Sequence, residues 1–136
     1  LADDAARLAA EGATVVYLAR GARLAGLVAL ADAIKDSTPA AVAALRAAGL
    51  RVVMATGDQA GSAARVAATL GLDEVHAGLR PEDKLALVER LQAEGRVVAM
   101  AGDGINDAPA LARATVGIAM GTGTDVAMQS AAVTLV

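Results

Sequence analysis

Three oxygen-bearing side chains with the chemistry to hold a cation follow one apolar run of the sequence. Asp103, Asn106 and Asp107 come just after residues 97–101, which are typical of a buried strand. In open α/β sheets, ligands bind beyond the carboxyl ends of the strands. Two carboxylates so close together repel each other unless a positive charge lies between them. Hard oxygen ligands without cysteine or histidine favour Mg²⁺, so the stretch predicts a magnesium site; an acidic surface turn is the alternative.

A second polar stretch follows another apolar run. Thr56, Gly57 and Asp58 come directly after residues 50–55, which contain the β-branched Val52 and Val53 and predict a buried strand. A threonine hydroxyl and an uncrowded glycine amide are donors that suit a phosphate-like anion. Because parallel strands end at one edge of a sheet, we expect this stretch to face the same crevice as the acidic one. An ordinary helix-capping turn is the alternative for these three residues taken alone.

Lys84 is the third candidate, because it lies in the first turn of a helix that opens at Pro81. A cation in this place opposes the helix dipole, and an acidic side chain would be favoured there. An anionic ligand would explain a lysine held against the dipole, whereas the alternative is a solvated surface lysine. Asp83, the residue before it, is expected to cap the helix.

The segments that position these candidates alternate regularly between helical and strand-like patterns from residue 38 onward. The order predicts right-handed crossovers and a parallel sheet with flanking helices, that is, a Rossmann-like α/β fold. The expected helices are 39–48, 62–70, 81 to Gly95, a short one through 112 and a turn from 124; the expected strands are 50–55, 74–77, 97–101, 116–119 and a last one from 133.

The first part of the chain follows a different pattern. Residues 1–11 are helical in pattern and stop at Gly12, and residues 14–19 and 24–30 predict two strands of a hairpin. Polarity then rises abruptly over residues 31–38, which predicts a hinge. The expected organisation is therefore the end of a neighbouring domain over 1–30, the hinge over 31–38, and the parallel-sheet domain over 39–136.

Composition excludes several classes of function. The 136 residues carry a net charge of −3 with scattered basic side chains, which argues against a nucleic-acid partner. There is no cysteine, so disulfides and thiolate metal sites are excluded. The apolar runs are far shorter than the ~20 residues of a membrane helix. The chain starts with leucine and stops inside an apolar run, so we expect both ends to be cut from a longer polypeptide.

Three motifs, taken in their order and spacing, carry a family resemblance. They are T-G-D at 56–58, P-E-D-K at 81–84 and the highly specific G-D-G-I-N-D-A-P-A-L at 102–111. Together they resemble the phosphorylation domain of P-type ATPases, which belongs to the haloacid dehalogenase superfamily. The resemblance covers nearly the whole chain and implies that residues 1–30 are the end of a nucleotide-binding domain.

Two further stretches refine the resemblance. A-D-A-I-K-D at 31–36 resembles the family's D-P-x-K hinge, with Asp32 and Lys35 at matching positions. Ala33 replaces the hinge proline, which should loosen the linker. G-T-G-T-D-V-A at 121–127 and the tail over 130–136 look most like heavy-metal pumps, copper exporters ahead of zinc and cadmium ones.

The resemblance implies a role for each matching residue. Thr56, within T-G-D, would hydrogen-bond a phosphoryl group whose oxygens Lys84 neutralises, and Asp103 would bind Mg²⁺ beside it. The positions carried over are Thr56, Gly57, Asp58 and Lys84 as catalytic, Asp103 and Asp107 as metal-binding, and Asn106, Gly102 and Gly104 as supporting. ATP would be the substrate and Cu⁺ the transported ion. The partners would be membrane and actuator domains, with this segment on the cytoplasmic side.

One motif of the family is missing, because no D-K-T-G-T occurs in the sequence. That motif carries the aspartate that becomes phosphorylated, so the chain would have supporting residues without a nucleophile, and we expect it to be inactive by itself. Its strand would lie between 50–55 and 97–101, which predicts unpaired edges and a poorly stable isolated chain. Two alternatives stay open: a stand-alone pseudoenzyme that binds Mg²⁺ and phosphate, and a soluble phosphatase with Asp58 as nucleophile.

Overall fold

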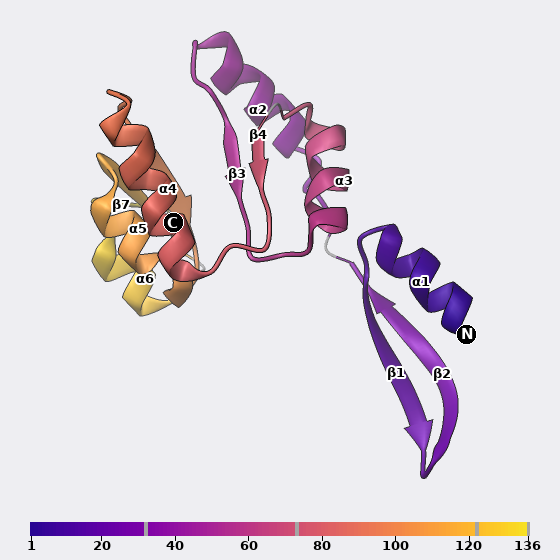
Figure 1. The fold of residues 1–136 in the computed structure, drawn as a ribbon. Coiled ribbons are helices and arrows are strands. Elements are labelled where there is room, and N and C mark those ends of the chain that lie inside the picture. The colour runs from indigo at the N-terminus through magenta and orange to yellow at the C-terminus, as the bar shows by residue number, and fades with distance from the viewer. Residues whose placement is uncertain (32, 73, 122, 136) are drawn as a thin grey trace. The chain divides into compact units, whose positions relative to one another are not determined.

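The structure, a computed structural model, describes residues 1–31, 33–72, 74–121 and 123–135. The chain forms two compact units, Leu1–Gly78 and Leu79–Val136, and each is described by itself (Figure 1). Both units combine helices with parallel strands, and the first also contains an antiparallel hairpin. The expected α/β class is confirmed, but the parallel strands form two separate sheets.

The first unit begins with a helix and a hairpin. Helix α1 (Ala2–Ala10) is followed by strands β1 (Thr14–Arg20) and β2 (Arg23–Leu30), which pair antiparallel. Gly21 lies in the turn with φ +62°, a conformation that glycine adopts without strain. The expected helix and hairpin are therefore confirmed.

A parallel strand pair completes the first unit. Helix α2 (Thr38–Ala47) leads to strand β3 (Val53–Ala55), and helix α3 (Ala60–Leu70) connects β3 to strand β4 (Glu74–His76). The expected buried strand over 50–55 is thus wrong in extent: three of its residues form the strand, and these are half-buried. The reason is that, within the described residues, β3 pairs only with β4 and its other edge has no strand beside it.

The segment expected to be a hinge enters α2. Asp32, one of its two matching positions, lies outside the described residues. Lys35 is exposed, and its carbonyl oxygen accepts a hydrogen bond from the backbone N–H of Thr38 at 2.9 Å. The domain boundaries drawn around this hinge stay a prediction.

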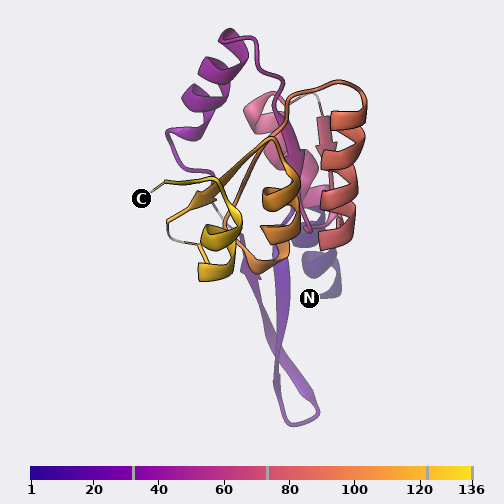
Figure 2. The ribbon, with the colours of Figure 1, turned by 90° about the vertical axis from the view of Figure 1, so that its left-hand side faces the viewer.

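The second unit is a three-stranded parallel sheet with helices. Its sheet order is β5-β6-β7, and α5 and α6 both contact β6, while α4 and α5 pack side by side (Figure 2). The elements in chain order are α4 (Pro81–Ala93), β5 (Ala99–Gly102), the 3-10 turn η1 (Ile105–Asp107), α5 (Ala108–Arg113), β6 (Val116–Met120), α6 (Asp125–Ser130) and β7 (Val133–Leu135).

Small side chains form the core of this unit. Ala110, Leu111, Ala119 and Ala127 are all at most 1% exposed, which fits a sequence with neither phenylalanine nor tryptophan. Strand β5 differs from its prediction, because it starts at Ala99 and its residues alternate between exposed and half-buried. In the described part of the chain, β5 pairs only with β6, so one of its edges has no strand beside it.

Candidate active site

The acidic loop after β5 divides its side chains between the interior and the solvent. Strand β5 ends at Gly102, and η1 then turns the chain into α5, which has Pro109 in its first turn. Asp107 points inward and is 8% exposed, whereas Asp103 and Asn106 are exposed. The three side chains therefore differ in burial, and the described residues hold no group of three or more acidic, histidine or cysteine side chains suited to a metal ion.

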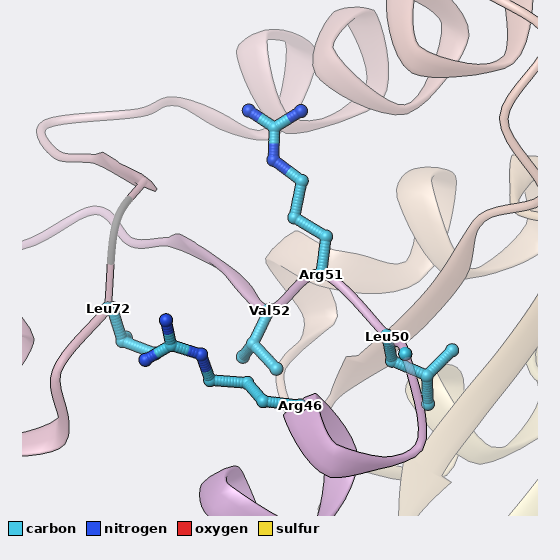
Figure 3. Close-up of a pocket in the computed structure, with 6 residues that line it drawn as sticks. Arg46, Leu50, Arg51, Val52 and Leu72 are labelled. Carbon is cyan, nitrogen blue, oxygen red and sulfur yellow. The ribbon is translucent and has the colours of Figure 1, made fainter.

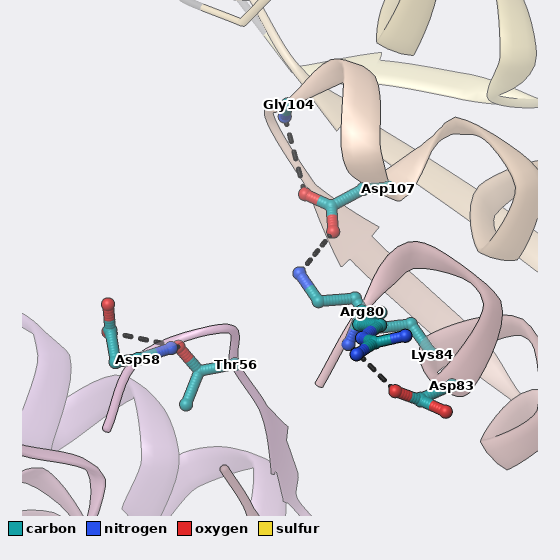
Figure 4. A network of polar contacts seen from close by, with 7 residues as sticks. All are labelled: Thr56, Asp58, Arg80, Asp83, Lys84, Gly104 and Asp107. Atoms are coloured by element: carbon teal, nitrogen blue, oxygen red, sulfur yellow. Dashed lines mark hydrogen bonds and ion pairs between the residues drawn. The ribbon is translucent and has the colours of Figure 1, made fainter. Parts of the chain in front are cut away.

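Asp107 is paired with Lys84. The Lys84 Nζ donates to Asp107 Oδ1 at 2.7 Å, and the two side chains are only 13% and 11% exposed (Figure 4). The second carboxylate oxygen of Asp107 accepts the backbone N–H of Gly104 at 3.3 Å. The lysine that opposes the helix dipole thus has an internal anionic partner, which the sequence reasoning did not identify.

Helix α4 holds Lys84 in its first turn. Pro81 occupies the start of the helix, where its missing N–H costs nothing. Asp83 Oδ2 accepts the backbone N–H of Arg80 at 2.9 Å, so the expected capping role of Asp83 is confirmed. The cap fixes the helix start, and with it the position of the Lys84 backbone.

Gly102 allows Asp107 to approach the end of β5. A Cβ at this position would lie 2.7 Å from the Asp107 Cβ, 2.8 Å from its Oδ2 and 2.9 Å from its Cγ. Real Cβ contacts are essentially never shorter than 3.0 Å, so any larger residue would displace the Asp107 side chain. The sequence assigned Gly102 a supporting part, but the contact itself depends on tertiary structure.

The Asp103 carboxylate is the group best suited to a metal ion. It is exposed at the carboxyl end of β5, and it makes no hydrogen bond or ion pair within the described residues. Mg²⁺ is commonly held by one or two carboxylates together with waters and substrate phosphates. Asp103 fits that pattern, with the exposed Asn106 as a further oxygen donor nearby in sequence, whereas both oxygens of Asp107 already accept hydrogen bonds.

The T-G-D stretch forms a compact turn in the first unit. The Thr56 hydroxyl donates to Asp58 Oδ2 at 2.9 Å and accepts the backbone N–H of Asp58 at 3.1 Å (Figure 4). Two backbone hydrogen bonds tie this turn to the end of β4: Thr56 N–H to the His76 carbonyl at 2.9 Å, and Gly78 N–H to the Asp58 carbonyl at 2.8 Å. Gly57 is exposed between them. The turn therefore presents polar groups at the carboxyl end of β3.

A pocket of about 270 Å³ lies at the opposite ends of the same strands (Figure 3). Its lining includes Leu50 and Val52, which precede β3, and Leu72, which precedes β4. Arg46, also in the lining, donates to the Gly71 carbonyl at 2.6 Å. Ligands of parallel sheets bind beyond the carboxyl ends, so this pocket is separate from the T-G-D turn of the same unit.

Comparisons with known proteins identify the family of the chain. A model of the haloacid dehalogenase-like hydrolases matches residues 1–115. The chain is 62% identical over 125 residues to a silver exporting P-type ATPase of Salmonella typhimurium, covering 92% of this chain and 15% of that protein. It is 54% identical to a copper-transporting P-type ATPase of Rhizobium leguminosarum bv. viciae, covering 100% of this chain and 16% of that protein.

Solved structures of heavy-metal P-type ATPases are also similar to this chain. A crystal structure of a zinc-transporting PIB-type ATPase matches with a TM-score of 0.84 and 44% identity, covering 99% of this chain and 22% of that one. The chain belongs to the haloacid dehalogenase-like hydrolase family. Within that family it corresponds to a segment of the catalytic region of heavy-metal P-type ATPases, and it spans about a sixth of the length of the curated relatives it matches. Among the described residues, no helix is long and apolar enough to cross a membrane.

Proposed function

We propose that this chain is a catalytic segment of an ATP-driven heavy-metal pump that works through a phosphorylated aspartate. The observation that carries the proposal is the arrangement after β5, where a shielded Lys84–Asp107 pair lies in the same unit as an exposed Asp103 carboxylate. The 62% identity to a silver exporter supports the same assignment. The sequence contains no D-K-T-G-T, so the nucleophilic aspartate would come from another segment of a longer polypeptide.

Lys84 would bind the oxygens of the phosphoryl group. Its ammonium group has three N–H donors, and one of them is directed to Asp107 at 2.7 Å. The others can donate to a phosphate, and the fixed position means that little reorganisation is needed when charge develops there. Asp107 would act by holding Lys84 in place and, with Asn106, by orienting Asp103.

Asp103 would hold Mg²⁺, with Gly102 and Gly104 shaping the loop around it. When bound, the ion would stabilise negative charge on the transferring phosphoryl group. Thr56 and Gly57 would donate hydrogen bonds to the phosphoryl oxygens. Because the Thr56 hydroxyl donates to Asp58 at 2.9 Å, it would have to turn from that carboxylate to the ligand.

Copper(I) export is the specific activity that we propose. Copper is the ion named for most of the relatives, while silver and zinc are named for others. The residues that select the ion would lie in membrane helices of the longer protein, on whose cytoplasmic side this segment would work with an actuator domain. ATP would be the phosphoryl donor.

The first test is to sequence the gene outward from both ends of this segment. We expect a D-K-T-G-T motif upstream and membrane helices on both sides, one of them carrying Cys-Pro-Cys. A reading frame limited to these 136 residues would refute the pump and leave a pseudoenzyme that binds Mg²⁺ and phosphate. Transport of Cu⁺, Ag⁺ and Zn²⁺ into membrane vesicles by the longer protein then distinguishes the ions.

A second test uses the 136-residue chain itself. We expect no hydrolysis of ATP or of p-nitrophenyl phosphate, because the chain lacks the family's nucleophile. Hydrolysis that Asp58→Asn abolishes and Asp36→Asn leaves unchanged would instead establish the soluble phosphatase. Asp36 is the matched control because it is an exposed aspartate that does not follow a strand of a parallel sheet.

A further inference from the structure

The turn after β6 has no part in the function proposed above, yet it lies against the backbone of Asp103. Strands β5 and β6 are parallel neighbours with Gly102 opposite Ala119, so the loops beyond their carboxyl ends adjoin. The backbone N–H of Thr124 donates to the Asp103 carbonyl oxygen at 2.9 Å. The turn is therefore joined directly to the residue assigned to the metal ion.

Gly123 adds a close backbone approach to this hydrogen bond. A Cβ at Gly123 would lie 2.5 Å from the Asp103 carbonyl oxygen, 2.9 Å from the Asp103 Cα and 2.9 Å from the Met120 carbonyl oxygen. All three are backbone atoms, so no flexible side chain could move aside to relieve the overlap. Only glycine at this position lets the turn reach Asp103.

Gly102, the residue before Asp103, is held in place by the Asp107 side chain. Gly102 lies so close to the Asp107 side chain that an added Cβ would overlap it, and Asp107 is itself fixed by Lys84. The Asp103 backbone is thus constrained on two sides while its carboxylate is exposed. Mg²⁺ needs nearly ideal octahedral geometry at about 2.0–2.1 Å, so the position of a ligand backbone affects the affinity.

We propose that Gly123 and the backbone N–H of Thr124 position Asp103 for Mg²⁺. They act through the Asp103 backbone and do not touch the ion. The inference rests on the proposed function, because it requires Asp103 to be the metal ligand. It assigns a physical role to Gly123 and Thr124 of the G-T-G-T stretch, whose Thr122 lies outside the described residues.

The expected effect follows from how sensitive metal sites are to their supporting groups. Loss of a group that orients a ligand typically weakens metal affinity about 10- to 100-fold. A shift of about 0.5 Å in a ligand is enough to degrade a site, and Gly123→Ala requires at least that shift between Cβ and the Asp103 oxygen. We expect Gly123→Ala to weaken Mg²⁺ binding about 10-fold.

The measurement is Mg²⁺ affinity of the full 136-residue chain by displacement of Mn²⁺, which prefers the same oxygen ligands. Electron paramagnetic resonance gives the free Mn²⁺, and broadening of the Gly102 and Gly104 amide signals locates the bound ion. Asp103→Ala tests the metal site itself. If that variant binds Mn²⁺ like the original chain, the metal role in the proposed function is wrong.

Two controls separate positioning from general loss of stability. Gly117→Ala creates an equally severe backbone overlap, with the Leu111 carbonyl, and does not contact Asp103. Thr124→Ala removes the side-chain cap of α6, which accepts the Ala127 N–H at 3.3 Å, but keeps the backbone N–H that reaches Asp103. Both should keep the original affinity within about 3-fold, below the roughly 10-fold loss of a misplaced ligand.

Thr124→Pro removes that N–H without adding a side chain at Gly123. The φ of −77° at Thr124 suits proline, but the ring Cδ takes the place of the N–H and would push the Asp103 carbonyl oxygen away. We expect Thr124→Pro to bind Mg²⁺ about 10-fold more weakly than Thr124→Ala. Equal affinities of these two variants would overturn the inference, as would equal losses in Gly123→Ala and Gly117→Ala. If a glycine variant fails to fold, the Thr124 pair decides.

Discussion

Replacing Lys84 by methionine should destabilise the second unit by about 3 kcal/mol. The variant keeps most of the apolar stem and removes the charge that faces Asp107 at 2.7 Å. At that distance two unit charges attract by about 6 kcal/mol with an effective dielectric constant of about 20, much of which desolvation offsets. Removing one partner of a buried pair costs about 3–5 kcal/mol, because the other charge stays unpaired. The lower end applies here, since Asp107 keeps 11% exposure and the Gly104 hydrogen bond.

The matched control is an exposed ion pair in the same unit. Arg113 Nε lies 3.1 Å from Glu89 Oε1, and both side chains are about half exposed. Glu89→Gln should therefore cost less than about 1 kcal/mol. Hydrogen exchange at the buried Leu111 and Ala119 amides reports the free energy of unfolding of this unit. If Lys84→Met costs no more than Glu89→Gln, the pair is not shielded as described, and the electrostatic reasoning for the site is wrong.

Three further substitutions test individual contacts. Gly102→Ala should cost about 1–3 kcal/mol in urea unfolding, because its Cβ would overlap Asp107; an unchanged midpoint would contradict that contact. Asp83→Ala should cost about 1 kcal/mol by the same assay, since it removes the acceptor at the start of α4. Thr56→Val should lower the stability of the first unit by about 1 kcal/mol, whereas Asp58→Asn keeps an acceptor and should change it by less than about 0.5 kcal/mol. Thermal unfolding followed by the fluorescence of the single tyrosine, which lies in that unit, measures both.

Local features of the fold could be predicted because their causes are local. Glycines after the helices mark where α1, α2, α3 and α4 end; Gly12, Gly49, Gly71 and Gly95 all have positive φ. The hairpin and the order of helices and strands follow from alternation in the sequence. These features depend on neighbouring residues along the chain, which is the information that sequence patterns contain.

Strand extent and burial could not be predicted in the same way. Residues 50–55 and 97–101 are apolar enough for central strands, but burial also requires neighbours on both edges. Val97 is 84% exposed, and β3 contains only three residues. The sequence indicates which residues favour a strand, whereas the neighbouring strands determine its length and its burial.

The candidate site was predicted as a set of residues but not as a set of contacts. The position of Lys84 against the helix dipole indicates a site residue, but its partner Asp107 lies 23 residues away. The family resemblance assigns both residues to one site, but it does not predict that they pair with each other. The role of Gly123 likewise appears only when β6 is placed beside β5.

The open edge of β5 makes the chain prone to self-association. Between Arg96 and Asp103 there is neither a charged residue nor a proline, and the stretch V-V-A-M-A-G carries backbone groups with no strand beside them on one side in the described part of the chain. Natural proteins usually protect such edges with charges or prolines, because another copy can add a strand there. At high concentration the chain should form aggregates that grow by strand addition at this edge. Ala99→Lys would place a charge on the edge strand and should reduce this aggregation.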